Sequence, residues 1–212
     1  MVKIFHLIHR FMCFAQRVAD LMNKRLITRL MQERVEGIKH SGVYFFRGDY
    51  DHILQGAALE YVPRGLYVWS YQFPLFDFLG PNLSYSKRLA ENSFIEKGAM
   101  SENEIVDFVM SAPEVCAEFK GEAALSLQDF VRVLEVGRTR SSHAKLIQAA
   151  ALILLGQESA AAALLQELPP FLHPKDVPHC NKLAEALKSG EGLAEDILQQ
   201  TRKKNLIALG LA

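Results

Sequence analysis

The chain has 212 residues, of which 50% are hydrophobic and 23% are charged, and its 24 basic side chains balance 24 acidic ones. This apolar content excludes an intrinsically disordered chain, and 13 glycines, 8 prolines and 3 cysteines exclude the collagen-like and disulfide-scaffold classes. A net charge of zero provides no overall attraction to nucleic acid or to an anionic membrane. We find no catalytic or cofactor motif, so the functional hypotheses depend on weaker patterns.

The first predicted element is a long amphipathic helix over residues 4–34. Apolar residues recur there at spacings of three and four from Ile4 and Ile8 onwards, which is the periodicity of one helix face. No proline or glycine interrupts the pattern before Gly37, although Asn23 marks a point at which the helix can break. We therefore expect a long helix whose broad apolar face packs on the rest of the protein.

Between residues 41 and 86 the pattern changes to that of β-strands. Runs rich in β-branched and aromatic residues are separated by turn formers, and they predict strands over residues 42–47, 52–62, 66–73 and 83–86. Pro63 and Gly65 predict a tight turn between the second and third of these strands. Because the strands follow one another with no intervening helix, we expect an antiparallel meander.

From Ser101 the helical periodicity returns and continues to the C-terminus. Ser101 and Glu104 have the spacing of a capping box, and further helices are predicted to begin near residues 113, 126, 142, 158, 176 and 193. The predicted fold is therefore α+β, with a long N-terminal helix, an antiparallel sheet of about four strands and an all-helical C-terminal half. We place a boundary near residue 95, between a helix-plus-meander region (1–95) and a helical region (96–212), and leave open whether the two share one core.

The cysteines and the N-terminus bear on the compartment and on metal binding. The three cysteines are Cys13, Cys116 and Cys180. They contain no CxxC pair, which predicts free thiols rather than a zinc or redox site, and we expect no metal and no cofactor. His6, His9 and Arg10 interrupt the apolar N-terminus, which is untypical of a signal peptide. No other apolar run approaches the roughly 20 residues of a membrane span, so we expect a soluble, cytoplasmic protein.

The clearest asymmetry of charge lies in residues 1–40, which carry eight basic and three acidic side chains. Basic residues recur there every seven positions and so lie along one side of a helix. The candidate partner-binding surface consists of Lys3, Arg10, Arg17, Lys24, Arg25 and Arg29. Such a surface suits an acidic protein partner, RNA or a membrane surface. The alternative, which we favour, is that these charges simply face solvent.

The strand predicted over residues 66–73 places aromatic side chains on one side only. Tyr67, Trp69, Tyr71 and Phe73 alternate with less aromatic neighbours. Because the other side becomes polar at Ser70, we expect the aromatic side to pack inward as core. If it is exposed instead, Tyr67, Trp69 and Tyr71, with Arg47, Asp49 and Asp51 nearby in the sequence, are the candidate ligand-binding residues.

One stretch of the chain resembles known families. Gly37 and Ile38, the run Tyr44–Arg47, Asp51, Gln55 and the aromatic strand resemble uncharacterised bacterial domain families in which a helix precedes an antiparallel meander. Some of these families occur near toxin–immunity systems, which implies a protein-binding role. Our preferred hypothesis is therefore a non-enzymatic interaction or adaptor protein, with an immunity-like role, whose partner is another protein. The alternatives are an enzyme or small-ligand binder using the aromatic strand, and nucleic-acid binding through the basic helix.

Overall fold

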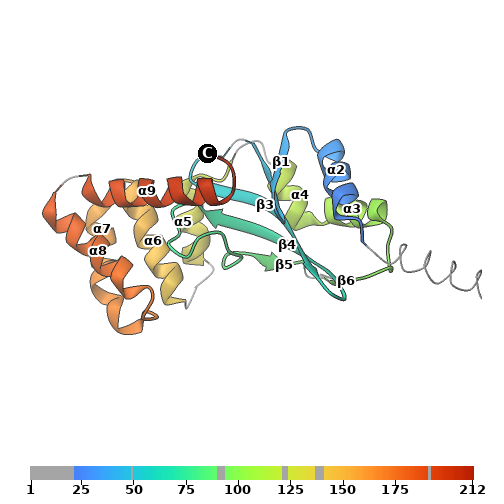
Figure 1. Cartoon of the computed structure of the whole chain (residues 1–212). Coiled ribbons are helices and arrows are strands. Elements are labelled where there is room, and N and C mark those ends of the chain that lie inside the picture. The colour runs from blue at the N-terminus through green and yellow to red at the C-terminus, as the bar shows by residue number, and fades with distance from the viewer. Residues whose placement is uncertain (1–21, 49, 90–93, 121–123, 137–140, 191) are drawn as a thin grey trace, which may run out of the picture. The chain divides into compact units, whose positions relative to one another are not determined.

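The structure is a computed structural model that describes residues 22–48, 50–89, 94–120, 124–136, 141–190 and 192–212 (Figure 1). Its strands are β1 (Ile38–Ser41), β2 (Tyr44–Arg47), β3 (Ile53–Val62), β4 (Gly65–Pro74), β5 (Lys87–Arg88) and β6 (Phe94–Glu96). Its α-helices are α2 (Lys24–Arg34), α3 (Glu102–Ser111), α4 (Pro113–Lys120), α5 (Leu127–Val136), α6 (Ser142–Leu154), α7 (Glu158–Glu167), α8 (Val177–Ser189) and α9 (Leu193–Ala208), and Pro169–Phe171 forms the 3-10 turn η1. The predicted α+β class is confirmed.

The strands form one antiparallel sheet in the order β1-β2-β3-β4-β5, and β6 also pairs with β4. The meander is confirmed, but the described sheet has six strands rather than about four. The strand predicted over residues 83–86 is wrong, because this segment forms a turn. The Asn82 side-chain oxygen accepts the Ser84 N–H at 2.8 Å. Hydrogen bonds of this kind, from a side chain to the nearby backbone, stabilise turns and compete with strand pairing.

The predicted N-terminal helix is described only in part. Helix α2 begins after Asn23, whose side-chain oxygen accepts the N–H of Leu26 at 3.1 Å and so caps the first turn. The point at which we expected a break is therefore a helix start. Residues 1–21, which contain most of the predicted helix, lie outside the described residues.

The chain divides into two compact units, each assembled from several segments. Unit 1 takes its described residues from 1–48, 56–71 and 87–121, and unit 2 takes its described residues from 49–55, 72–86 and 122–212. Where the sequence indicated a single boundary near residue 95, the segments of the two units alternate along the chain. Helices α3 and α4 belong to unit 1, whereas the stretch between β4 and β5 belongs to unit 2.

In unit 1, helices α2, α3 and α4 cover one face of the sheet (Figure 1). Its core contains Ile27 from α2, Val106 from α3, and Leu59 and Val68 from the sheet, all fully buried. The capping box predicted at the start of α3 is confirmed, because the Ser101 and Glu104 side chains each bond the backbone of the other. Helix α3 therefore starts where its apolar face can meet α2.

In unit 2, helices α5 to α9 pack as successive neighbours around α6. Eight of the thirteen residues of α6 are buried, which is the pattern of a helix covered on nearly all sides. Leu183 of α8 and Leu198 of α9 are fully buried in the same core. Within the described part of the chain, no helix combines the length and the apolar character that crossing a membrane requires.

Candidate functional site

The aromatic strand predicted from the sequence is β4. Near its start, the buried face is the one opposite the aromatic residues, which is the reverse of our expectation. Leu66 and Val68 are fully buried in the core of unit 1, whereas Tyr67 and Trp69 on the other face are only half-buried. The prediction that the aromatic side packs inward is therefore wrong for Tyr67 and Trp69. It is correct for Tyr71, which is fully buried.

Tyr67 and Trp69 are held in place by an arginine from β5, which pairs with β4. The Arg88 guanidinium lies 4.4 Å from the ring centre of Tyr67 and 4.7 Å from that of Trp69, a range in which cations are attracted to aromatic faces. The indole N–H of Trp69 donates to the Glu60 carboxylate at 3.0 Å. We call Tyr67, Trp69 and Arg88 the aromatic–arginine patch.

The other predicted site residues belong to different segments of the chain. Arg47 is half-buried in β2, opposite Ile38 of β1, and Asp51 pairs with His52 at 2.6 Å in unit 2. Asp49 lies outside the described residues. Among the described candidates, Arg47 therefore belongs to unit 1 with Tyr67, Trp69 and Tyr71, and Asp51 belongs to unit 2.

The basic surface predicted on the first helix is described only over α2. Lys24, Arg25 and Arg29 are exposed there. The Lys24 ammonium lies 4.4 Å from the ring centre of Tyr61, and Arg29 pairs with Glu33 at 3.5 Å. The predicted residues Lys3, Arg10 and Arg17 lie outside the described residues.

A cluster of buried charges in unit 2 was not predicted from the sequence. Asp77 is fully buried and Asp176 is 4% exposed. His143 lies between them, with Nε2 3.2 Å from an Asp77 oxygen and Nδ1 3.2 Å from an Asp176 oxygen. We call these three residues the His143 cluster. Buried carboxylates of this kind require partners, because an unpaired buried charge is costly.

Three segments of unit 2 position the cluster. Asp77 sits in the turn after β4, where it accepts the N–H of Leu79 at 2.8 Å. The side-chain amide of Asn205 on α9 donates to the carbonyls of Leu75 and Asp77 at 2.7 and 2.8 Å, which fixes that turn. His143 is in the first turn of α6, and Asp176 is the residue before α8.

The protonation of the cluster follows from its surroundings. Burial lowers the pKa of His143, but the hydrogen bond and charge of Asp77 and the charge of Asp176 outweigh this effect and leave the pKa raised. Burial also raises the pKa of Tyr85, and the two carboxylates raise it further, so its hydroxyl stays protonated. The cluster therefore combines two carboxylates with an imidazole that favours its charged form.

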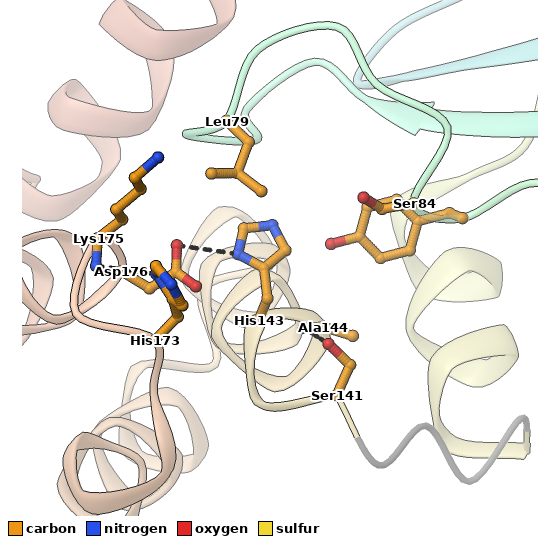
Figure 2. A pocket seen from close by; sticks show the side chains of 9 residues that line it. Leu79, Ser84, Ser141, His143, Ala144, His173, Lys175 and Asp176 are labelled. Atoms are coloured by element: carbon orange, nitrogen blue, oxygen red, sulfur yellow. Dashed lines mark hydrogen bonds and ion pairs between the residues drawn. The ribbon is translucent and has the colours of Figure 1, made fainter.

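Two members of the His143 cluster, His143 and Asp176, line a cavity of about 380 Å³ (Figure 2). We call this cavity the His143 pocket. It is lined by Leu79, Ser84, Tyr85, Ser141, His143, Ala144, His173, Lys175 and Asp176. Of its lining residues, Asp176 is buried and His143 is partly buried, whereas Ser84, His173 and Lys175 are exposed. A concave site with a few convergent polar groups is typical of small-molecule binding.

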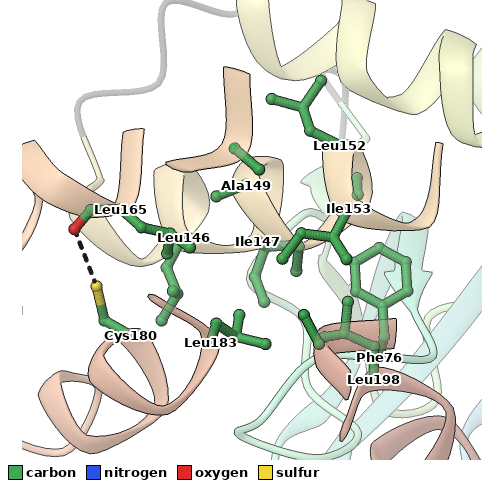
Figure 3. Packing of buried hydrophobic residues seen from close by; sticks show 14 of the residues in the cluster. Phe76, Leu146, Ile147, Ala149, Leu152, Ile153, Leu165, Cys180, Leu183 and Leu198 are labelled. Atoms are coloured by element: carbon green, nitrogen blue, oxygen red, sulfur yellow. Dashed lines mark hydrogen bonds between the residues drawn. The ribbon is translucent and has the colours of Figure 1, made fainter. Parts of the chain in front are cut away.

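The metal and cysteine expectations can be compared with the described residues. No group of three or more histidine, cysteine or acidic side chains suited to hold a metal occurs among them. Cys180 is a free, buried thiol in the core of unit 2, and its sulfur lies 3.5 Å from the Leu165 carbonyl (Figure 3). Burial raises the pKa of this thiol, which makes it a poor nucleophile.

No protein-family model, curated protein or solved structure matches this chain.

Proposed function

We propose that the protein is a non-enzymatic binding protein and that the His143 pocket holds a small polar molecule. The observation that carries this proposal is the coincidence of a cavity with a buried charge cluster. Titratable groups with a shifted pKa that line a concave site, as His143 and Tyr85 do here, are characteristic of functional sites. The pocket volume of about 380 Å³ lies within the range of small-molecule sites.

The geometry favours binding over acid–base catalysis. A general base or acid must reach the proton it transfers within hydrogen-bonding distance. Both ring nitrogens of His143 already face carboxylates at 3.2 Å. The Asp77 carboxylate bonds Nε2 and the Asp176 carboxylate lies within ion-pair distance of Nδ1, so the two carboxylates orient the imidazole.

Binding is tested by NMR, because histidine ring protons report directly on this pocket. The resonances of His143 and His173 are assigned with the His143→Gln and His173→Gln variants, and the protein is then titrated with butyrate, inorganic phosphate or methylammonium. We expect saturable shifts of both signals with at least one probe. Ser84→Phe, which places a ring at the exposed rim, should abolish the shifts, and Ser111→Phe, at an exposed serine of unit 1, should not. Shifts that Ser84→Phe leaves intact, or no shift with any probe, would contradict the proposal.

A second candidate function is protein interaction through the aromatic–arginine patch, with an immunity-like role for the adaptor. The supporting observation is that Tyr67 and Trp69 stay half-buried, with an exposed Arg88 beside them. Tyrosine, tryptophan and arginine are the residues most enriched at interface hot spots. A partner captured by the wild type and lost by Trp69→Ala and Arg88→Ala, but retained by Arg25→Ala on α2, would support it. Capture that all these variants share would exclude the patch.

A further inference from the structure

We infer that the ligand of the His143 pocket is a small organic cation, an amine in its ammonium form, whose N–H group is bound by the Asp176 carboxylate. This inference rests on the proposed function and assigns the chemical class of the ligand. It depends on a buried oxygen that is left without a hydrogen bond and on the balance of charge in the His143 cluster.

The Asp176 carboxylate is buried but incompletely bonded. Its side chain is 5% exposed, and the residue lines the cavity. Within the ranges that the structure describes, Oδ1 of Asp176 has no hydrogen-bond partner. Nδ1 of His143 lies 3.2 Å from this oxygen, at ion-pair distance, but that nitrogen also lacks a hydrogen bond there. Because a buried acceptor without a donor is costly, Asp176 is suited to accept an N–H from a molecule in the cavity.

The place of Asp176 in the fold makes this missing bond informative. Asp176 is the residue before α8, where an aspartate side chain commonly accepts a backbone N–H of the first helical turn. Its side chain forms no such capping bond. In Figure 2 the Asp176 carboxylate points toward the His143 ring instead. The carboxylate is therefore directed to the imidazole beside the cavity and is not used to cap α8.

The His143 cluster carries an excess of negative charge. The carboxylates of Asp77 and Asp176 each lie 3.2 Å from the one imidazole of His143, which supplies at most one positive charge. Asp77 also accepts the Leu79 N–H at 2.8 Å and faces the Asn82 amide at 3.4 Å. A bound ammonium would bond Asp176 and also neutralise the remaining charge, whereas water or a neutral ligand would only supply the bond.

The rest of the lining suits an ammonium on a short apolar body. An ammonium has three N–H donors, and the buried Tyr85 hydroxyl, which has no hydrogen-bond partner in the described part of the chain, provides a second oxygen to accept one. Leu79, 51% exposed, and Ala144, which is buried, contribute apolar surface. The carbon atoms of the ligand can therefore rest against these two side chains.

One lining residue opposes a cation. Lys175 is exposed, and its ammonium repels a positively charged ligand. Water and salt screen exposed charges, whereas a buried carboxylate acts more strongly on its neighbours. We therefore expect opposite effects at two adjacent residues. Removing the charge of Asp176 should weaken binding, and removing the charge of Lys175 should strengthen it.

The test compares methylammonium, tetramethylammonium, butyrate and inorganic phosphate at constant pH and ionic strength, with dissociation constants taken from the NMR titration. We expect millimolar binding of methylammonium. Tetramethylammonium, which carries the charge but no N–H, should bind about tenfold more weakly.

Two pairs of variants test the assigned residues. Asp176→Asn should weaken methylammonium binding by about tenfold, whereas Asp196→Asn, at an exposed aspartate in the first turn of α9, should change it little. Lys175→Gln should strengthen binding by about two- to threefold, the scale of an exposed charge interaction. Lys182→Gln, at an exposed lysine of α8 outside the lining, should not. Circular dichroism shows whether Asp176→Asn folds, and the exposed position of Lys175 provides a test that does not depend on it.

The outcomes separate the two proposals. Saturable binding of butyrate or phosphate without methylammonium overturns the cationic class and leaves the pocket as a ligand site. Equal affinity for methylammonium and tetramethylammonium, weaker methylammonium binding in Lys175→Gln, or unchanged binding in a folded Asp176→Asn also overturns the inference. No saturable shift with methylammonium, butyrate or phosphate overturns the proposed function, and the cationic class with it.

Discussion

Removal of the Asp77 carboxylate is the most informative perturbation of the His143 cluster. Asp77→Ala deprives the Leu79 N–H of its acceptor at 2.8 Å and removes one of the two carboxylates that flank His143. Breaking a buried pair by deleting one partner costs about 3–5 kcal/mol. Because His143 keeps Asp176 at 3.2 Å, we expect a loss at the lower end, about 3 kcal/mol, from the free energy of unfolding of unit 2.

The two units can be followed separately during unfolding. The single tryptophan, Trp69, belongs to unit 1, so its fluorescence reports on that unit in a urea titration. Far-UV circular dichroism reports mainly on unit 2, which contains helices α5 to α9. We expect the dichroism midpoint to fall strongly in Asp77→Ala. Asp196→Ala, an exposed acidic residue in the first turn of α9, should cost at most about 1 kcal/mol.

A second substitution separates charge from hydrogen bonding at the same position. Asp77→Asn retains an oxygen that can accept the Leu79 N–H but removes the negative charge. Because the hydrogen bond and charge of Asp77 raise the pKa of His143, this pKa should fall in Asp77→Asn, measured by NMR titration of the imidazole protons. Equal stability of Asp77→Ala and Asp196→Ala, together with an unchanged His143 pKa, would refute the electrostatic account of the cluster.

Three further predictions address pH dependence and unit 1. The pKa of His143 is raised in the folded state, so the protonated imidazole stabilises the fold. This stabilisation is complete below the pKa of the unfolded chain, near 6.5, and is lost as the pH rises through the pKa of the folded state. The thermal midpoint should therefore decline over that pH range in the wild type, and His143→Gln should abolish the decline. Gly56→Ala should destabilise unit 1 by more than about 2 kcal/mol, because its Cβ would lie 2.0 Å from the Phe45 carbonyl oxygen; unchanged unfolding by Trp69 fluorescence would contradict this. Ser101→Ala should cost about 1 kcal/mol by removing the cap of α3, and a cost below about 0.3 kcal/mol would show that the cap is dispensable.

The helices were predicted well because the residues that start or stop a helix lie at the ends of the segments that show helical periodicity. The capping box at Ser101 and the glycine after α6, Gly156 with φ of 70°, lie where the sequence indicated a start and a stop. The two shortest strands, β5 and β6, were not predicted, because a run of two or three residues is too short to show the alternation of a strand. Their pairing with β4 depends on contacts between segments distant in the sequence.

The burial of β4 could not be predicted from its own residues. A period of two defines two faces, but it does not say which is covered when both carry large apolar side chains. We took Ser70 as the sign of an exposed face, yet it is only 8% exposed. Residues of β4 up to Tyr71 belong to unit 1 and the residues after it to unit 2. A single assignment of buried and exposed faces therefore does not hold along the whole strand.

The His143 cluster was missed because its members are far apart in the sequence, with Asp77 and His143 separated by 66 residues. One local signal was present. Asp77 lies in the apolar run Leu75–Leu79, between Phe76 and Phe78, and a lone carboxylate in such a run is rarely buried without a partner. That signal predicts a buried ion pair, although it does not identify the partner.

The His143 cluster also allows stability to be distinguished from function. Replacing a buried ionic group with apolar residues of similar volume is often neutral or stabilising by about 1–4 kcal/mol. In the combined variant Asp77→Leu, His143→Leu, Asp176→Leu this gain is opposed by one loss, because the Leu79 N–H no longer has its acceptor. We expect this variant to fold with a midpoint between those of Asp77→Ala and the wild type, measured by circular dichroism, and to lose binding of the probes, measured by the His173 resonance. A folded variant that still binds these probes with wild-type affinity would show that the buried charges do not contribute to ligand binding.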